Sequence, residues 1–244
     1  MRYTLAPFLK RVVSAFVNDY SVLFGGTDEF CGGGDVLSID RTDAFTVSAW
    51  LKASATGVNH VIMSKVEGGP NLGYQFWYTS ASRAGLWFFD AAGSLSVSIN
   101  VSVPLAWNHV VFTGDGTGTA AGVKIYINGV LGGNTVGTDT LSSTLINTRQ
   151  FELGGGGGVG FSPWQGNQDE VSMWTTDLNQ TEIDEIYNGG EPNNLLAHSA
   201  AASLRAWWRM GDGDTFPTLL DQTANNYDVT MTNMESGDIE TDVP

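Results

Sequence analysis

Carboxylate pairs are the first side chains to consider for chemistry, because two carboxyl groups that face each other across a sugar can hydrolyse a glycosidic bond. Glu182 and Asp184 are separated by one residue, the spacing that places two side chains on one face of a strand. Apolar residues around them recur every three to four positions, however, which predicts a helix. Asp169 and Glu170 are neighbours in a predicted strand, so we expect them to point to opposite faces. The sequence therefore predicts a protein that is not an enzyme.

The other reactive side chains are also poorly placed for catalysis. His60, His109 and His198 are the only histidines, and none lies near a Gly-x-Ser-x-Gly turn. Cys31 is the only cysteine, which excludes an intrachain disulfide and a thiolate zinc site of the usual kind. His109 alternates with Val110 inside a predicted strand, and we expect it to be structural.

Aromatic rings offer a different chemistry, because sugar-binding pockets combine flat apolar faces with a few polar groups. Trp77, Tyr78 and Trp164 lie in or beside predicted loops, and we predict that these three residues bind carbohydrate. Tryptophans in a β-sandwich are mostly buried. The core is accordingly expected to hold four others: Trp50, Trp107, Trp174 and Trp207.

Strands separated by glycine-rich turns must position these side chains. Residues 109–113 and 123–127 are β-branched and aromatic runs, and Asn128-Gly129 supplies the positive φ angles of a tight hairpin turn. Strand patterns recur along much of the remaining chain and suit a β-sandwich. They fall at residues 45–52, 61–65, 74–79, 85–89, 95–101, 151–153 and 169–174, with a short helix at 181–189.

The composition narrows the class of protein further. A chain of 244 residues with 31 glycines, 12 phenylalanines and 15% charged residues suits many short strands around an aromatic core. The formal net charge of −15 argues against nucleic-acid binding, which depends on Lys and Arg neutralising phosphates. No stretch approaches the roughly 20 apolar residues of a membrane span. Lys10 and Arg11 interrupt the apolar stretch near the N-terminus, so no secretory signal is expected.

Four segments occur in the order found in a known family. They are Phe-Thr-Val-Ser-Ala-Trp at 45–50, Trp-Asn-His-Val-Val at 107–111, Val-Lys-Ile-Tyr-Ile-Asn-Gly at 123–129 and Gly-Asn-Gln-Asp-Glu-Val at 166–171. Together they resemble the laminin-G-like (LamG) domains of the concanavalin-A-like jelly-roll superfamily. The resemblance implies an all-β fold, a two-sheet antiparallel β-sandwich with one short helix, to which an N-terminal arm or helix is added.

One segment of the resemblance is out of order. Residues 204–210, Leu-Arg-Ala-Trp-Trp-Arg-Met, together with residues 211–228, resemble the segment with which domains of this family normally begin. Here this segment comes last. We therefore infer a circularly permuted domain, a rearrangement that is physically easy because the termini of domains often lie close together.

The chain divides into three parts by sequence. An N-terminal arm at 1–20 precedes the LamG-like jelly-roll domain at 21–230, and an acidic C-terminal tail follows at 231–244. Apolar residues of the arm keep a helical spacing from Leu5 to Phe16. Two interpretations of the arm stay open: it covers an edge of the sandwich, or it docks onto another subunit. We interpret the acidic residues at the C-terminus as a surface tail or a docking strap.

The family resemblance also implies a structural calcium ion, held between an early turn and the Asp-Glu-Val strand. The matching metal ligands are Asp28 and Asp169, with Glu29 as a further candidate. Asp212 and Asp214 resemble loop ligands, although the other acidic positions of an EF-hand are absent. The alternative is that these acids are simply solvated on a strongly acidic protein.

The resemblance implies a function as well. Such domains occur in bacteriophage structural proteins, which implies a non-catalytic interaction module displayed on a virion as a capsid decoration or tail-fibre component. Its partners would be other subunits of the particle, in several copies, and cell-surface glycans. Two alternatives stay open: a stand-alone carbohydrate-binding adhesin at the cell surface or outside the cell, and a glycoside hydrolase.

Overall fold

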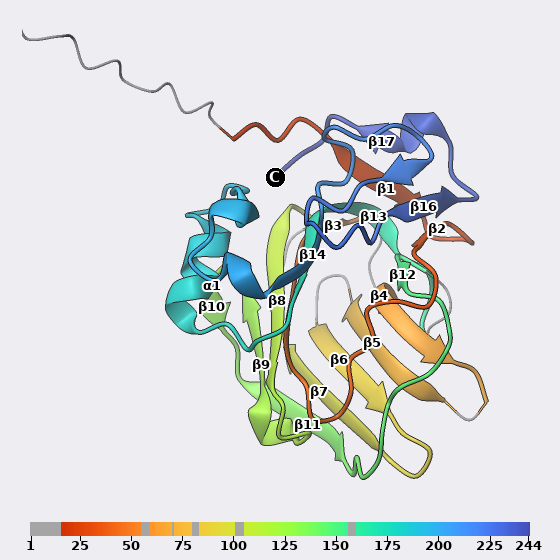
Figure 1. Cartoon of the computed structure of the whole chain (residues 1–244), viewed down its shortest axis with the longest axis vertical. Helices are drawn as coiled ribbons and strands as arrows, with labels where there is room; N and C mark the ends of the chain where they lie inside the picture. Colours follow the sequence, from red (N-terminus) through yellow and green to blue (C-terminus); the bar gives the residue numbers. More distant parts are fainter. Residues whose placement is uncertain (1–15, 55–58, 70, 80–82, 101–104, 156–159) are drawn as a thin grey trace, which may run out of the picture.

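The computed structural model describes residues 16–54, 59–69, 71–79, 83–100, 105–155 and 160–244. In these residues two antiparallel sheets pack against each other, and one α-helix lies outside the sandwich (Figure 1). The predicted fold class, an all-β two-sheet sandwich with one short helix, is confirmed. The helix-like pattern of residues 1–15 lies outside the described residues.

The first sheet has eight strands and is built around β13. This strand pairs with β3 along one edge and with both β1 and β14 along the other. The sheet order is β10 (Val130–Leu131), β9 (Val123–Ile127), β8 (Asn108–Asp115), β3 (Ala44–Ala53), β13 (Gln165–Trp174), β1 (Ser21–Gly25) and β17 (Ile239–Glu240), with β14 (Leu204–Trp208) beside β13. Residues 204–210, which resemble the segment with which domains of this family normally begin, thus contain β14, and β14 is a strand of this sheet.

The second sheet has nine strands and faces the first across the core. Its order is β11 (Asn134–Asp139), β7 (Ser94–Asn100), β6 (Arg83–Phe89), β5 (Leu72–Thr79), β4 (Asn59–Glu67), β12 (Glu152–Leu153), β2 (Phe30–Gly32), β16 (Val229–Thr232) and β15 (Thr218–Leu219). The strands β4 to β7 form a meander of sequential hairpins. Their alternating side chains therefore divide between the core and the outer face of this sheet.

Phenylalanine rings from both sheets fill the centre of the core. Phe76 on β5 lies 5.8 Å from Phe45 on β3, 5.2 Å from Phe112 on β8 and 5.9 Å from Phe88 on β6, measured between ring centroids. Edge-to-face and tilted contacts of this kind add to the free energy gained by burying the rings. The aromatic core predicted from the composition is therefore present.

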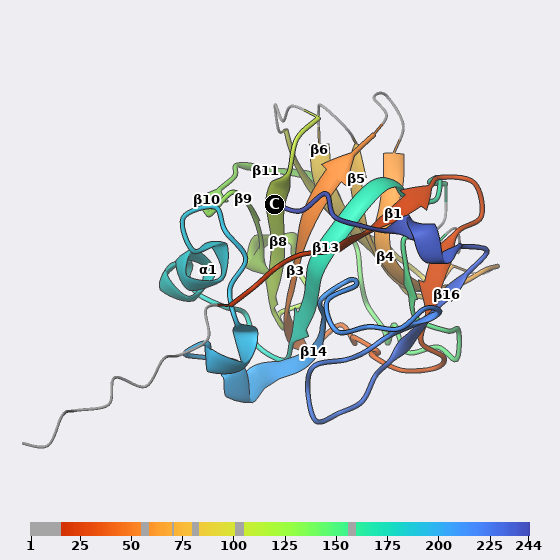
Figure 2. The ribbon, with the colours of Figure 1, turned by 90° about the horizontal axis from the view of Figure 1, so that it is seen from above.

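The helix α1 (Gln180–Tyr187) covers the outer face of the first sheet beside β8 to β10, as Figures 1 and 2 both show. Asn179 and Glu182 form a capping box at its N-terminus, and Asn188 ends it in the left-handed region. Ile183 and Ile186 pack in a second apolar cluster on that face. The short 3₁₀ helices are η1 (Ala120–Gly122), η2 (Leu195–Ala197), η3 (Ala201–Ser203) and η4 (Ser236–Asp238).

The C-terminal residues belong to the sandwich. The prediction that the domain ends at residue 230 and that residues 231–244 form a separate acidic tail is therefore corrected. β16 extends to Thr232 and pairs with β2, and β17 pairs with β1. Asp242 then accepts hydrogen bonds from Lys52 Nζ at 2.5 Å and from Trp107 Nε1 at 3.0 Å. The acidic composition concealed this arrangement, because pairing with strands at the other end of the chain leaves no local signal.

No helix in the described part of the chain is long and apolar enough to span a membrane.

Replacing Asp242 with alanine tests whether the C-terminus stabilises the sandwich. The variant loses the acceptor of both bonds, and we expect a loss of about 1 kcal/mol in the free energy of unfolding, measured by chemical denaturation. Glu191→Ala, at an exposed position outside the strands and helices, is the matched control. Equal stability of the two variants would contradict a structural role of the C-terminus.

Candidate functional site

Two of the three aromatic residues predicted to bind sugar are core residues. Tyr78 is 3% exposed and Trp164 is 0% exposed, and their ring centroids lie 6.0 Å apart. Tyr78 follows the alternation of β5, which also directs Tyr74 and Phe76 toward the other sheet. The backbone N–H of Trp164 donates to the carbonyl of Gly154 and fixes the ring inside the sandwich. Their burial contradicts the predicted stacking on sugar.

Trp77, the third predicted residue, lies on the outer face of β5. Its indole extends across Gly85 on β6, where an added Cβ would be 2.4 Å from the indole ring. Phe161 stacks on this indole with a centroid distance of 5.2 Å and an interplanar angle of 24°. Trp77 is therefore only 8% exposed, and glycine at position 85 is what lets the indole lie flat on the sheet.

A groove of about 280 Å³ lies beside this stack, on the outer face of β5, β6, β7 and β11. We call it the outer groove. Trp87 and Phe161 are the half-buried aromatic residues in it, and their rings meet edge-on with 6.0 Å between centroids. Phe89 packs beside Trp87 at 4.7 Å. The polar residues of the groove are Asn59, Arg83, Ser96, Ser98 and Thr135.

The register of the strands places the hydroxyl groups of the outer groove next to its aromatic rings. Ser96 is the cross-strand partner of Trp87, and Ser98 is the partner of Gly85. Ser98 is also paired with Thr135 on β11. In the described part of the chain, the hydroxyls of Ser98 and Thr135 have no hydrogen-bond partner. Ring faces beside free hydroxyls are suited to bind a polar ligand with apolar faces.

Trp87 and Phe161 are groove residues that the sequence did not reveal. For Trp87 the alternation of side chains along β6 offered a signal. Ala84, Leu86 and Phe88 face the core, so Trp87, which lies between them in sequence, faces outward. Phe161 follows a run of glycines and has no periodic neighbours, so no pattern indicated where its ring lies.

The predicted metal ligands Asp28 and Asp169 lie at opposite ends of β1. Val22 pairs with Gln168, which places Asp169 beside Ser21 and leaves Asp28 beyond the far end of the strand. The intervening strand is about 13 Å long. Asp28 instead accepts a hydrogen bond from Asn233 Nδ2 at 3.0 Å. These two acids therefore cannot share a calcium ion.

The other acidic candidates for a metal site have protein partners. The carboxylate of Glu29 accepts the backbone N–H groups of Thr27 and Asp28, at 2.8 and 3.1 Å. Asp214 accepts those of Gly211 and Leu220, each at 2.8 Å. Among the residues described, no group of three or more His, Cys, Asp or Glu side chains is arranged to hold a metal ion. A structural calcium ion stays a prediction without a ligand set.

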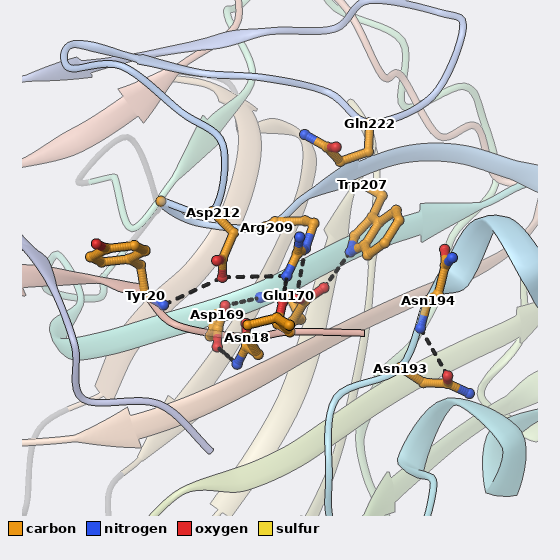
Figure 3. Close-up of polar contacts among 12 residues, drawn as sticks. Asn18, Tyr20, Asp169, Glu170, Asn193, Asn194, Trp207, Arg209, Asp212 and Gln222 are labelled. Carbon is orange, nitrogen blue, oxygen red and sulfur yellow. Dashed lines mark hydrogen bonds and ion pairs between the residues drawn. The ribbon is translucent and has the colours of Figure 1, made fainter. Parts of the chain in front are cut away.

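A second polar site surrounds Arg209 in the turn after β14 (Figure 3). Arg209 Nε donates to Glu170 Oε1 at 3.2 Å, and Nη2 lies 3.4 Å from Asp212 Oδ2 and donates to the carbonyl of Val17. Trp207 Nε1 donates to Glu170 Oε2 at 2.5 Å. We call Arg209 and its three acidic neighbours, Asp169, Glu170 and Asp212, the Arg209 cluster.

Residues 16–20, which we call the N-terminal strap, cover the Arg209 cluster. Asn18 Nδ2 donates to Asp169 Oδ2 at 2.7 Å. Two backbone N–H groups of the strap donate to Asp212, and the Phe16 ring centroid lies 4.4 Å from the guanidinium carbon. This end of the predicted arm therefore packs on its own sandwich, which agrees with the first of the two interpretations of the arm.

The position of Asp169 and Glu170 corrects the expectation that their carboxylates point to opposite faces. A β-bulge interrupts the pairing of β13 with β3 between Asp169 and Ser172, and Glu170 has a φ of +47°. The bulge brings both carboxylates to the Arg209 cluster (Figure 3). They are 0% and 4% exposed beneath the N-terminal strap, so a sugar cannot reach them as a catalytic pair.

Burial controls the protonation of the Arg209 cluster. Three carboxylates share one guanidinium, so full ionisation would bury excess negative charge. Burial raises the pKa of Asp169, and the charge of Glu170 raises it further. Burial also raises the pKa of Glu170 to about 7, although the charge of Arg209 and the hydrogen bond from Trp207 oppose this shift. The cluster therefore binds protons more tightly in the folded chain than in the unfolded one.

This architecture defines a class of protein: a lectin-like β-sandwich with a groove of aromatic rings and hydroxyls. Residues 24–184, more than half of the chain, match the model of the Laminin_G_3 family, described as the concanavalin A-like lectin/glucanases superfamily. The chain belongs to this family, as the sequence resemblance predicted. A comparison with curated protein sequences gave no significant match.

Solved structures share the fold at low sequence identity. A Bacteroides ovatus protein assigned as carbohydrate-binding is 16% identical, with a TM-score of 0.59 over 91% of this chain, which spans 59% of that protein's length. The heptameric SAP-like pentraxin of Limulus polyphemus is 18% identical, with a TM-score of 0.52 over 72% of this chain and 86% of that one. The CBM40 of Ruminococcus gnavus IT-sialidase, bound to α2,3-sialyllactose, is 15% identical, with a TM-score of 0.50 over 68% and 96%.

Replacing Glu170 with glutamine tests the protonation of the Arg209 cluster. A carboxyl group whose pKa is raised by folding stabilises the protein at low pH, and this contribution is lost as the pH rises through about 7. For Glu170 the loss is on the order of 3 kcal/mol. We expect Glu170→Gln to gain stability relative to the wild type as the pH is raised from about 5 to about 8, measured by denaturation at each pH.

Glu67→Gln is the matched control for this experiment, because Glu67 is an exposed carboxylate at the end of β4. This variant removes a carboxylate outside the Arg209 cluster, so it should not reproduce the gain in stability expected of Glu170→Gln. A constant difference between Glu170→Gln and the wild type across the pH range would refute the raised pKa of Glu170.

Proposed function

We propose that this chain is a non-catalytic carbohydrate-binding module that holds a short glycan in the outer groove. The observation that carries the proposal is the half-buried indole of Trp87, which shares this groove with the unpartnered hydroxyls of Ser98 and Thr135. A sugar ring has apolar C–H faces and a polar rim. It can therefore stack on an indole while its hydroxyls exchange hydrogen bonds with serine and threonine.

The size of the outer groove supports a short ligand. Its volume of about 280 Å³ lies just below the range of roughly 300 to 1,000 Å³ that is common for small-molecule sites. A monosaccharide or disaccharide suits this space better than a long chain. The sheet beneath the groove is rigid, because β5, β6 and β7 are paired along their whole lengths.

Two indole donors in the same place also support a polar ligand. Trp77 Nε1 and Trp87 Nε1 are buried and have no hydrogen-bond partner among the described residues. An unsatisfied buried donor costs about 1 to 3 kcal/mol. A ligand oxygen that reaches either donor after a small shift of the rings would recover part of this cost. If the groove bound an apolar partner instead, the two indole N–H donors would stay without a hydrogen-bond acceptor.

The similar proteins agree with this proposal. The Bacteroides ovatus protein is assigned as carbohydrate-binding, and the CBM40 of the Ruminococcus gnavus sialidase was solved with sialyllactose. Hydrolysis has less support, because Asp169 and Glu170 are buried beneath the N-terminal strap. Binding without catalysis is thus the simplest use of the outer groove.

The place in which this module acts stays a prediction from the sequence. The module could be displayed on a virion, as a capsid decoration or tail-fibre component among other subunits. It could also be displayed as an adhesin at the cell surface or outside the cell. Both placements would use the outer groove. The N-terminal strap packs on the Arg209 cluster of its own chain, and residues 1–15 lie outside the described residues.

A glycan array followed by calorimetry on the best ligand tests the proposal. We expect Trp87→Ala to weaken binding at least tenfold, since alanine removes the stacking surface and about 1.4 kcal/mol corresponds to tenfold in affinity. Phe30→Ala is the matched control, because Phe30 is also half-buried but lines a different groove with Asp28, Arg149 and Glu152. Loss of binding in Phe30→Ala alone would move the site to that groove, and unchanged affinity in both variants would refute the proposal.

A further inference from the structure

We infer that the outer groove selects saccharides that carry a carboxylate, and that Arg83 binds this group. The inference rests on the proposed function and names its ligand class. Arg83 lines the outer groove, and its side chain is exposed. Among the described residues, no aspartate or glutamate lines the groove with it.

Half of the basic residues that the structure describes form ion pairs with carboxylates, and Arg83 is one of those that do not. The chain has 26 acidic residues and 11 Lys and Arg residues, so a basic side chain would be expected to find an acidic partner. Lys52, Lys65, Arg149 and Arg209 each form an ion pair with a carboxylate. Arg83 forms none with any described residue. A cation that has no ion pair among the described residues, on a protein with a net charge of −15, is available to an anionic ligand.

The strand pairing aligns Arg83 with the aromatic part of the groove. Arg83, Gly85 and Trp87 occupy alternate positions of β6 and therefore share its outer face. Four residues of strand place the backbone of Arg83 about 13 Å from that of Trp87. The indole of Trp77 crosses Gly85 between them, so a ligand that contacts both residues would also lie against the stack of Trp77 and Phe161. A long flexible arginine can span much of this distance toward a ligand stacked on Trp87.

The chemistry of the guanidinium favours a carboxylate as the bound group. Its planar fork of N–H donors matches the two oxygens of a carboxylate, and such charge-assisted pairs are stronger than neutral hydrogen bonds. The hydroxyls of Ser98 and Thr135 remain for the sugar's own hydroxyls. Uronic acids and sialic acids both present a ring, hydroxyls and one carboxylate, which are the three features that this groove can bind.

The test compares matched acidic and neutral glycans on the intact chain. Two pairs of probes serve: sialyllactose with lactose, and cellobiouronic acid with cellobiose. We expect the wild type to bind at least one acidic member about tenfold to a hundredfold more tightly than its neutral partner, the range expected of a charged hydrogen-bonded pair. Arg83→Gln should abolish this preference, so that the acidic and neutral members bind with equal affinity. Arg83→Lys, which keeps the charge but not the fork, should fall between the two.

Arg205→Gln is the matched control, because Arg205 lines a separate cavity with Ser38 and Trp174. It should keep the acidic preference, and added salt should weaken only the acidic ligand's binding. Equal binding of the acidic and neutral members would overturn the inference while the proposed function stands. The same holds for an acidic preference that survives Arg83→Gln. If the wild type binds neither member of either pair and no other glycan on an array, both the inference and the proposed function fail.

Discussion

Alternation of side chains along β5, β6 and β7 builds the core and the outer groove at once. Phe76, Leu86 and Val97 face the first sheet, so their strand neighbours must face outward. Those neighbours include Trp77 and Trp87, together with the serines of β7. A one-residue slip between these strands would exchange the two faces, which the burial of the core prevents. The free energy that stabilises the sandwich therefore also fixes the geometry of the groove.

The Arg209 cluster has a different role, because it fixes the N-terminal end of the described chain. It ties the N-terminal strap to β13 and to the turn after β14 through charged hydrogen bonds. Three buried acids around one arginine are costly when all are ionised, so the strap is held by a site that prefers to keep a proton. We regard the cluster as a structural clasp that is sensitive to pH and that lies on the other sheet from the outer groove.

Local patterns in the sequence predicted the fold well and the site only in part. Residues 109–113, 123–127 and 181–189 carried clear strand, turn and helix signals, and all three were confirmed. The C-terminal strand β17 gave no such signal, because its pairing with β1 depends on contacts between the two ends of the chain.

The prediction of individual site residues from the sequence was wrong at several positions, for physical reasons that the structure identifies. The loop position of Trp164 suggested exposure, but a hydrogen bond to Gly154 turns it into the core. The bulge at Glu170 requires a positive φ in a residue other than glycine, for which the sequence offers no marker. Trp77 does line the outer groove, yet its own ring is covered by Phe161. To identify Trp87 as a groove residue, one had to know which face of β6 points outward.

The most direct test of sugar binding in the outer groove is an NMR titration that follows the indole N–H signals of the eight tryptophans. We expect saturation with a bound glycan to shift the signals of Trp77 and Trp87 and to leave those of the buried Trp174 and Trp207 in place. A bound glycan that leaves Trp87 unmoved, and shifts backbone signals around Phe30 instead, would contradict the assignment of the groove.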